Sequence, residues 1–301
     1  MKYSNPKIPE GINSSEENPL KEFALLTTGA FTFIIALVFL LGSILDWSSQ
    51  FIPFSYEQEI AQPFVDEFLN DDMSKLTSDS DLVASYLQKL ADNITPFMSL
   101  EEDVEITLHY VNQGTVNGMA TLGGNIFIFR GLLEKLPSEN ALVMLLAHEI
   151  AHVKLRHPVK SLSKGVLISL IFAVVSGQSN SDVTGLLSGT SQLAFLGFSR
   201  TQEQDADNEA IQLSQKYYQH TQGANELFKV LLAESKQANI ETIALLSSHP
   251  EVLERINAVK ALSQANNWTQ QGELILVPSN IVERLVQDKL AQESEENIQD
   301  N

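Results

Sequence analysis

A long uncharged apolar run stands near the start of the chain, from Phe23 to Leu45. A helix of that length is about 34 Å long, which is enough to cross a hydrocarbon core of ~30 Å. The alternatives are a buried core helix and a cleaved signal peptide. Acidic residues precede the run and no small-residue cleavage site follows it, which disfavours a signal peptide. The pattern therefore predicts an uncleaved transmembrane anchor over residues 23–45.

Basic residues indicate which way this anchor faces. Lys2, Lys7 and Lys21 precede it, whereas no Lys or Arg follows it before residue 75. The positive-inside rule then places the N-terminal tail, residues 1–22, in the cytoplasm. The rest of the chain is expected on the other side of the membrane.

Helical spacing of apolar residues returns after the anchor. Residues 46–103 show this spacing and are rich in acids, which predicts an acidic helical connector. Residues 104–265 form the expected main domain, with strand-like alternation at 104–110 and 125–131 and longer helical patterns elsewhere. Residues 266–301 offer a short strand, an amphipathic helix and an acidic tail that we expect to be disordered. The predicted fold class is α+β, mainly α, with a small β-sheet.

Two further apolar segments, Gly165–Gly177 and Val183–Phe198, interrupt the main domain. The first is too apolar for a surface loop and short for a membrane span. We expect a packed or partly lipid-facing helical hairpin. Two additional membrane passes are a less favoured alternative, because Gly and Ser interrupt both segments.

Charge and composition limit the partners of the chain. Its 301 residues include 38 acidic and 19 basic side chains, for a net charge of −19. Such a surface repels phosphate backbones, which argues against nucleic-acid binding, and it is not attracted to anionic lipid head groups. The chain contains no cysteine. A metal ion must therefore be held by His, Asp or Glu side chains.

Candidate chemistry lies on a helix predicted for residues 139–157, which Ser138 can cap. His148 and His152 are four residues apart, so both imidazoles project from one face and can share a metal ion. Glu149 is offset from that face, yet close enough to accept a proton from an attacking water. The alternative is a set of polar core residues without a metal, which is disfavoured because burying three such groups costs several kcal/mol.

A third ligand is needed, because catalytic zinc usually takes three protein ligands. His157 lies about 140° round the helix from His152, so we interpret it as a partner of the helix C-terminal dipole. A second predicted helix carries Glu203 and Asp207 four residues apart on one face. They suit a ligand and an acceptor for a ligand N–H group, although a solvated acidic face gives the same spacing.

Several motifs together resemble one family. HEIAHV, SRTQEQDAD and SSHPEVLERI follow a GGNIFIFRGLL segment in this order. The set is similar to the M48 family of zinc metallopeptidases, which includes HtpX-like and CAAX-prenyl-type membrane proteases. The resemblance covers residues 117–256. It departs at Asp205, where the family often has Glu, and at Leu122, where Pro is frequent, and neither departure removes a ligand.

The resemblance implies a mainly helical, gluzincin-type catalytic domain with one zinc ion per subunit. It assigns His148, His152 and Glu203 as zinc ligands, Glu149 as the catalytic base and Asp207 as the residue that orients a ligand.

His249 lies in the His-Pro element of SSHPEV. We expect it to donate to the oxyanion of the tetrahedral intermediate. A turn histidine before a proline and a fourth zinc ligand in a resting state remain alternatives.

We expect substrate to bind along the strand that follows a glycine pair. An extended substrate could add to an edge strand and leave its scissile carbonyl at the metal. An interior strand with a glycine turn is the alternative. The residues assigned to substrate binding are Gly123, Gly124, Asn125, Ile126 and Phe127.

Two functions are compatible with these features. The first is a membrane-anchored zinc endopeptidase of protein quality control, held by one span in a bacterial inner membrane with its catalytic domain in the periplasm. Its partners are protein or peptide substrates and, through the N-terminal helix, membrane lipid. The alternative is a catalytically latent zinc protein that acts as a chaperone or scaffold of envelope proteins. A structural zinc site would not need Glu149, so the sequence favours the endopeptidase. It does not indicate the oligomeric state.

Overall fold

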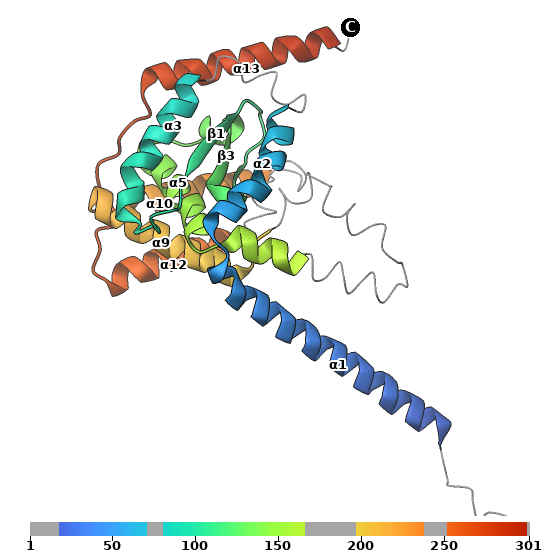
Figure 1. The fold of residues 1–301 in the computed structure, drawn as a ribbon. Helices are drawn as coiled ribbons and strands as arrows, with labels where there is room; N and C mark the ends of the chain where they lie inside the picture. The colour runs from blue at the N-terminus through green and yellow to red at the C-terminus, as the bar shows by residue number, and fades with distance from the viewer. Residues whose placement is uncertain (1–17, 71–80, 166–196, 238–251, 300–301) are drawn as a thin grey trace, which may run out of the picture. The chain divides into compact units, whose positions relative to one another are not determined.

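The computed structural model describes residues 18–70, 81–165, 197–237 and 252–299 (Figure 1). Contacts divide the chain into two units, residues 1–44 and 45–301. The long helix α1 (Pro19–Ser48) contains the predicted anchor, and none of its residues is buried. It is long and apolar enough to cross a membrane. The hairpin expected between residues 165 and 198 lies, apart from its ends, outside the described residues.

The second unit combines helices with a small sheet. Its described elements are η1 (Ser49–Phe51), α2 (Phe54–Asn70), α3 (Asp81–Ile94), η3 (Thr95–Phe97), β1 (Thr107–Val111), β2 (Gly118–Ala120), η4 (Leu122–Gly124), β3 (Asn125–Phe129), α4 (Arg130–Leu133), α5 (Glu139–Lys154), α9 (Arg200–Tyr218), α10 (Gln222–Gln237), α12 (Val252–Ala265) and α13 (Ser279–Gln299). The described elements therefore confirm the predicted α+β class with a preponderance of helix.

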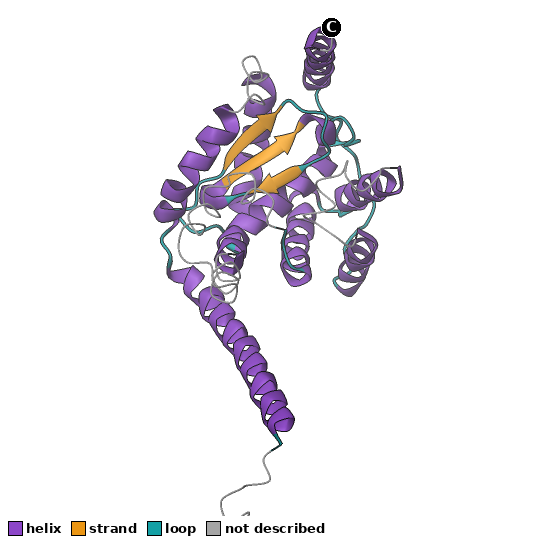
Figure 2. Ribbon diagram, turned by 90° about the vertical axis from the view of Figure 1, so that its right-hand side faces the viewer, coloured by secondary structure: helices purple, strands orange, loops and turns teal. Residues whose placement is uncertain are grey.

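The strands form a mixed sheet in the order β1-β3-β2 (Figure 2). Strand β1 pairs with β3 in parallel, and β2 pairs with β3 antiparallel. The expectation of an edge strand at residues 124–129 is therefore wrong, because β3 lies between two partners. Strand β2 could not be predicted from the sequence, because it has only three residues and is too short to show alternation.

The two faces of β3 pack into different hydrophobic clusters. Ile126 and Ile128 join the main hydrophobic cluster beneath the sheet. Phe127 and Phe129 join a second cluster with Val65 of α2. Successive side chains of a strand point to opposite faces, so the alternation in the sequence is enough to predict this division.

The glycine pair before β3 allows close approach to the protein's own backbone. Gly123 and Gly124 have φ angles of 67° and 76°, in the left-handed region that favours glycine. A Cβ atom on Gly124 would lie 1.9 Å from the carbonyl oxygen of Glu105, and one on Gly123 would lie 2.8 Å from Cα of Gln58 in α2. The pair thus lets α2 pack directly over this loop.

Helix α5 runs through the centre of the second unit (Figure 1). It contacts α3, α9, α10 and β2, and all of its residues from Asn140 to Val153 are buried. A helix surrounded in this way must satisfy its polar side chains internally, which places strong constraints on its histidines and glutamate. Side chains of α3, from the acidic segment after the anchor, belong to the same core.

The C-terminal segment differs from expectation in two respects. Residues 273–278 form no strand; instead, the backbone of Ile275 accepts from the Glu139 N–H and donates to the Asn140 side chain at the start of α5. The acidic tail is not disordered up to Gln299, because α13 extends to that residue. Ile281 and Leu285 are buried, and Asp288 accepts a hydrogen bond from Tyr110 of β1 at 2.9 Å.

Candidate metal centre

Helix α5 supplies two buried imidazoles to a shared point. The Ser138 hydroxyl accepts from the Ala141 N–H at 3.2 Å, as the predicted N-cap. His148 and His152 follow one helical turn apart and are 2% and 0% exposed. Their Nε2 atoms lie 3.0 Å from each other. The spacing of the HExxH motif thus converges both rings, as predicted.

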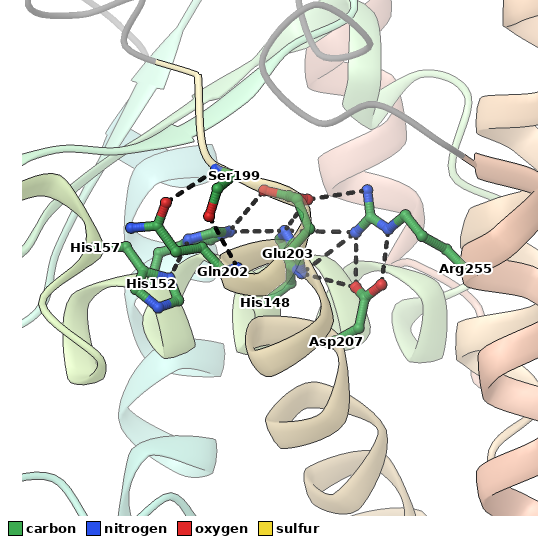
Figure 3. Close-up of polar contacts among 8 residues, drawn as sticks. All are labelled: His148, His152, His157, Ser199, Gln202, Glu203, Asp207 and Arg255. Carbon is green, nitrogen blue, oxygen red and sulfur yellow. Dashed lines mark hydrogen bonds and ion pairs between the residues drawn. The ribbon is translucent and has the colours of Figure 1, made fainter. Parts of the chain in front are cut away.

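Helix α9 supplies the third group. It begins with a capping box, in which Ser199 and Gln202 exchange side-chain and backbone hydrogen bonds. Glu203 follows in the first turn, with its carboxylate oxygens 3.5 Å from Nε2 of His148 and 3.4 Å from Nε2 of His152 (Figure 3). The structure therefore brings together the three predicted ligands.

The spacing and chemistry of these three groups fit zinc. Two atoms bound to one zinc ion at tetrahedral angles, each at about 2.0–2.1 Å, lie about 3.3 Å apart. The observed separations of 3.0, 3.4 and 3.5 Å, the last two to different oxygens of the Glu203 carboxylate, lie close to that value. Two imidazoles and one carboxylate are also a donor set of catalytic zinc sites.

The buried charges around the three groups also suit a divalent cation. Glu149, Glu203 and Asp207 can carry three negative charges, whereas Arg255 carries one positive charge, and all four are at most 6% exposed. The difference is two negative charges in a region shielded from water. A bound dication would neutralise it, which lowers the cost of burying these carboxylates.

The ligand histidine His148 contacts a charged pair formed by Asp207 and Arg255. Its Nδ1 atom lies 2.9 Å from Oδ1 of Asp207. The Arg255 guanidinium donates to both oxygens of Asp207, from Nε at 2.8 Å and from Nη2 at 2.7 Å. Burial alone would raise the pKa of Asp207, but Arg255 and His148 outweigh it and lower the pKa to about 2. Asp207 therefore stays ionised and can accept the Nδ1 proton of His148.

A role for Arg255 was not predicted from the sequence. It lies on α12 in the SSHPEVLERI segment, packs at 4.7 Å over the ring of Phe228 and has Nη1 3.4 Å from Glu203. A buried arginine needs a partner, but α12 also carries Glu254 and Lys260, so its sequence does not single out Arg255. The partner of Arg255 is also distant in sequence and is found only in the fold.

The second imidazole, His152, contacts the neutral side chain of His157 through its Nδ1 atom. This contact differs from the prediction that His157 interacts with the helix C-terminal dipole. The Nδ1 atoms of His152 and His157 are 2.9 Å apart. The prediction failed because α5 ends at Lys154, and Arg156 with φ 60° turns the chain back toward the ligand. Burial, with a contribution from the positive charge of Lys160, lowers the pKa of His157 to about 3. The ring of Phe198 stacks on His152 with centroids 3.9 Å apart.

The roles of the remaining predicted site residues stay predictions. Glu149 is buried on α5, between the two ligand histidines in the sequence. His249 lies outside the described residues, so its role stays a prediction. Asn125 uses its side chain within the protein, bonding to the Leu122 carbonyl and to His109. A substrate role for the loop and strand over residues 123–127 stays a prediction. It can no longer rely on an edge strand, because β3 has a partner strand on each side.

The fold and the site define a metallopeptidase domain in which two HExxH histidines and a glutamate from a later helix form the metal site. The chain belongs to peptidase family M48, which matches residues 83–263.

Relatives match much of the chain but have longer sequences. The beta-barrel assembly-enhancing protease of Escherichia coli K12 is 27% identical over 212 residues, covering 66% of this chain and 41% of the relative. The mitochondrial metalloendopeptidase OMA1 of Schizosaccharomyces pombe is 26% identical over 212 residues, covering 69% of this chain and 61% of the relative. For OMA1 of Saccharomyces cerevisiae the identity is 28% over 200 residues, and the coverage is 63% and 55%. The chain thus spans less than two thirds of each of these relatives.

Proposed function

We propose that this chain is a membrane-anchored zinc endopeptidase that cleaves protein substrates in quality control. The observation that carries the proposal is the buried set of His148, His152 and Glu203 with Glu149 on the same helix. A purely structural zinc site would be closed by four protein ligands and would gain nothing from a buried glutamate beside them. Relatives named as an assembly-enhancing protease and as metalloendopeptidases support proteolysis as the activity.

Each residue of the site then has a distinct part in hydrolysis. His148, His152 and Glu203 would hold a zinc ion, which would supply a Lewis acid to polarise a carbonyl and make water nucleophilic near neutral pH. Glu149 accepts the proton of the attacking water and can pass it to the departing amine. Asp207 accepts the Nδ1 proton of His148 and so directs its Nε2 lone pair to the metal.

Helix α1 supports the anchoring part of the proposal, because many of its large apolar side chains are exposed and do not pack into a protein core. Lysines precede it and no basic residue follows it closely. This asymmetry favours a cytoplasmic N-terminus and, in a bacterial inner membrane, a periplasmic catalytic domain.

The proposal is tested with the full chain extracted from membranes. In detergent, the zinc-loaded protein should cleave casein, and a chelator should abolish cleavage. Glu149→Gln should reduce turnover by at least about 100-fold while retaining zinc, because the amide cannot accept a proton and all three ligands remain. Atomic absorption reports the zinc content.

Three results would count against the proposal. Turnover of Glu149→Gln within about tenfold of the wild type would contradict the catalytic role of this residue. A zinc-loaded wild type without activity would favour a binding role instead. Recovery of the chain in the soluble fraction without detergent would contradict anchoring.

We further propose that substrate pairs with β2 rather than β3. Among the described residues, β2 pairs with β3 alone and packs against α5. Bonds between Asn117 and Phe129 and between Thr121 and Asn125 mark the positions that face β3. Gly118 and Ala120 alternate with them, so their backbone groups point to the opposite side.

A proline at Ala120 tests this assignment. The variant loses the N–H group that points away from β3, so the KM for a peptide should rise several-fold while zinc content and melting temperature change little. Proline at Met119, which faces β3, should lower the melting temperature instead. Unchanged KM in a folded Ala120→Pro variant would exclude β2 as the docking strand.

A further inference from the structure

The zinc ligand His152 is backed by an unusual partner, the imidazole of His157. Ligand histidines generally donate their second ring N–H to a carboxylate, a carbonyl or water. Here the two Nδ1 atoms are 2.9 Å apart, and both residues are buried. One of these nitrogens must therefore donate and the other accept.

The direction of this hydrogen bond follows from the ligand atom. Nε2 of His152 faces Glu203 and His148, so it must be free of a proton when it binds metal. The proton of His152 is then on Nδ1. His157 must accept it on Nδ1 and carry its own proton on Nε2. Only this pair of tautomers lets His152 bind metal through Nε2 while the two Nδ1 atoms share a hydrogen bond.

His157 is held in place by the turn after α5. Arg156 adopts φ 60°, which is uncommon for a residue with a side chain. Its guanidinium donates to the backbone carbonyls of Ser49 and Ile52 and pairs with Glu57 at 2.6 Å. We call this set of contacts the Arg156 clasp. It gives a reason for arginine at a position where glycine would adopt the backbone more easily.

The clasp ties the metal site to the segment that follows α1. Ser49 and Ile52 lie just beyond α1, and Glu57 lies in the first turn of α2. Glu57 is 4% exposed and also accepts from the Gly123 N–H at 3.4 Å, so the same carboxylate holds the glycine loop. The docking of residues 49–57 and the position of His157, which follows Arg156 in the chain, therefore both depend on the Arg156 side chain.

We propose that His157 is a positioning residue for the zinc ligand His152, held by the Arg156 clasp to the segment that follows the N-terminal helix. The proposal rests on the zinc site of the proposed function. It implies that zinc affinity depends on how residues 49–57 are docked, although none of them contacts a ligand in the described structure.

Zinc affinity of the full chain in detergent, measured by competition with a chromophoric chelator, tests the proposal. His157→Leu removes the acceptor and should weaken zinc binding by about 10–100-fold, as loss of outer contacts to metal ligands generally does. His157→Asn places an oxygen near the position of Nδ1 and should restore most of the affinity. Equal weakening by Leu and Asn would overturn the proposal, because it would indicate lost packing rather than a lost acceptor.

A second pair of variants tests the clasp. Arg156→Gly keeps a residue suited to positive φ but removes the guanidinium, so zinc affinity should fall, by less than for His157→Leu. Combining it with His157→Leu should add little, because both changes act through the same ring. Additive losses would overturn the link between clasp and ligand.

His220 provides a matched control. It is also buried, and its ring accepts from the Gln222 N–H and bonds to the Glu273 carbonyl, with no contact to the ligands in the described structure. His220→Leu should lower the melting temperature and leave zinc affinity unchanged. If His157→Leu behaves in the same way, the proposal is wrong. Casein cleavage by zinc-loaded wild type, run in parallel, shows separately whether the proposed function holds.

Discussion

The two imidazoles of the metal site are supported in different ways. Figure 3 shows Asp207 and Arg255 on one side of the ligand set and His157 on the other. His148 has an ionised carboxylate behind it, itself paired with a guanidinium. His152 has a neutral imidazole behind it and an aromatic ring stacked on its face.

This difference has consequences for the ligands. An ionised acceptor draws the Nδ1 proton and makes the imidazole a stronger donor to the metal, whereas a neutral acceptor fixes orientation with a smaller effect on basicity. A second buried carboxylate behind His152 would add negative charge to a site that already has an excess of it. The neutral partner therefore limits the charge that one divalent ion must balance.

Removing Glu203 should have the largest effect, because Glu203 is a ligand of the same metal ion that His148 and His152 bind. Glu203→Ala deletes a ligand, so zinc occupancy should be lost at micromolar free zinc. The melting temperature should then become independent of added zinc, since only binding to the folded state stabilises it. Atomic absorption and melting curves with and without zinc measure this. A variant that still gains stability from zinc would show that Glu203 is not a ligand.

Replacing Arg255 should disrupt only the charged pair that supports His148, which is formed by Asp207 and Arg255. Arg255→Met leaves the Asp207 carboxylate buried without its guanidinium partner, and breaking such a pair costs about 3–5 kcal/mol of unfolding free energy. Chemical denaturation of the chelated protein measures the loss. The double variant Arg255→Met with Asp207→Asn removes the stranded charge and should recover part of the stability. If both variants are equally unstable, packing of Arg255 on Phe228 dominates instead.

The two histidine ligands could be predicted from sequence because they lie within one helix. The spacing of four residues between His148 and His152 is a local property of that helix, whatever surrounds it. For Glu203 and Asp207 the same spacing also fits a solvated acidic face, and the resemblance to the M48 family assigned Glu203 as the third ligand.

The supporting groups could not be predicted in the same way. His157 was misplaced because helical geometry was extended past Lys154, where the chain leaves the helix at Arg156. Arg255 lies 48 residues after Asp207 in the sequence, and β2 is too short to show a period. Each depends on contacts between distant elements, which the pattern of a single segment does not encode.

Acidification should distinguish the support of His152 by His157 from the support of His148 by Asp207. The expected effect on stability is the smallest but the most specific. The pKa of His157 is about 3 in the fold and ~6.5 in an unfolded chain. Between these values the unfolded chain binds a proton that the folded chain excludes, so stability falls as the pH drops below ~6.5. The pKa of Asp207 is shifted in the same direction, so acid lowers stability through this group as well, but in a lower pH range: its pKa of about 2 lies below the unfolded value, and its contribution persists down to a pH of ~4 and is lost only toward 2. We therefore expect His157→Asn, measured in chelated protein, to lose less stability than wild type between pH ~7 and ~4.5. Asp207→Asn should follow the wild-type slope in that range and differ from it only at lower pH. A stability difference between His157→Asn and wild type that stays constant from pH ~7 to ~4.5 would contradict a buried neutral histidine behind the ligand.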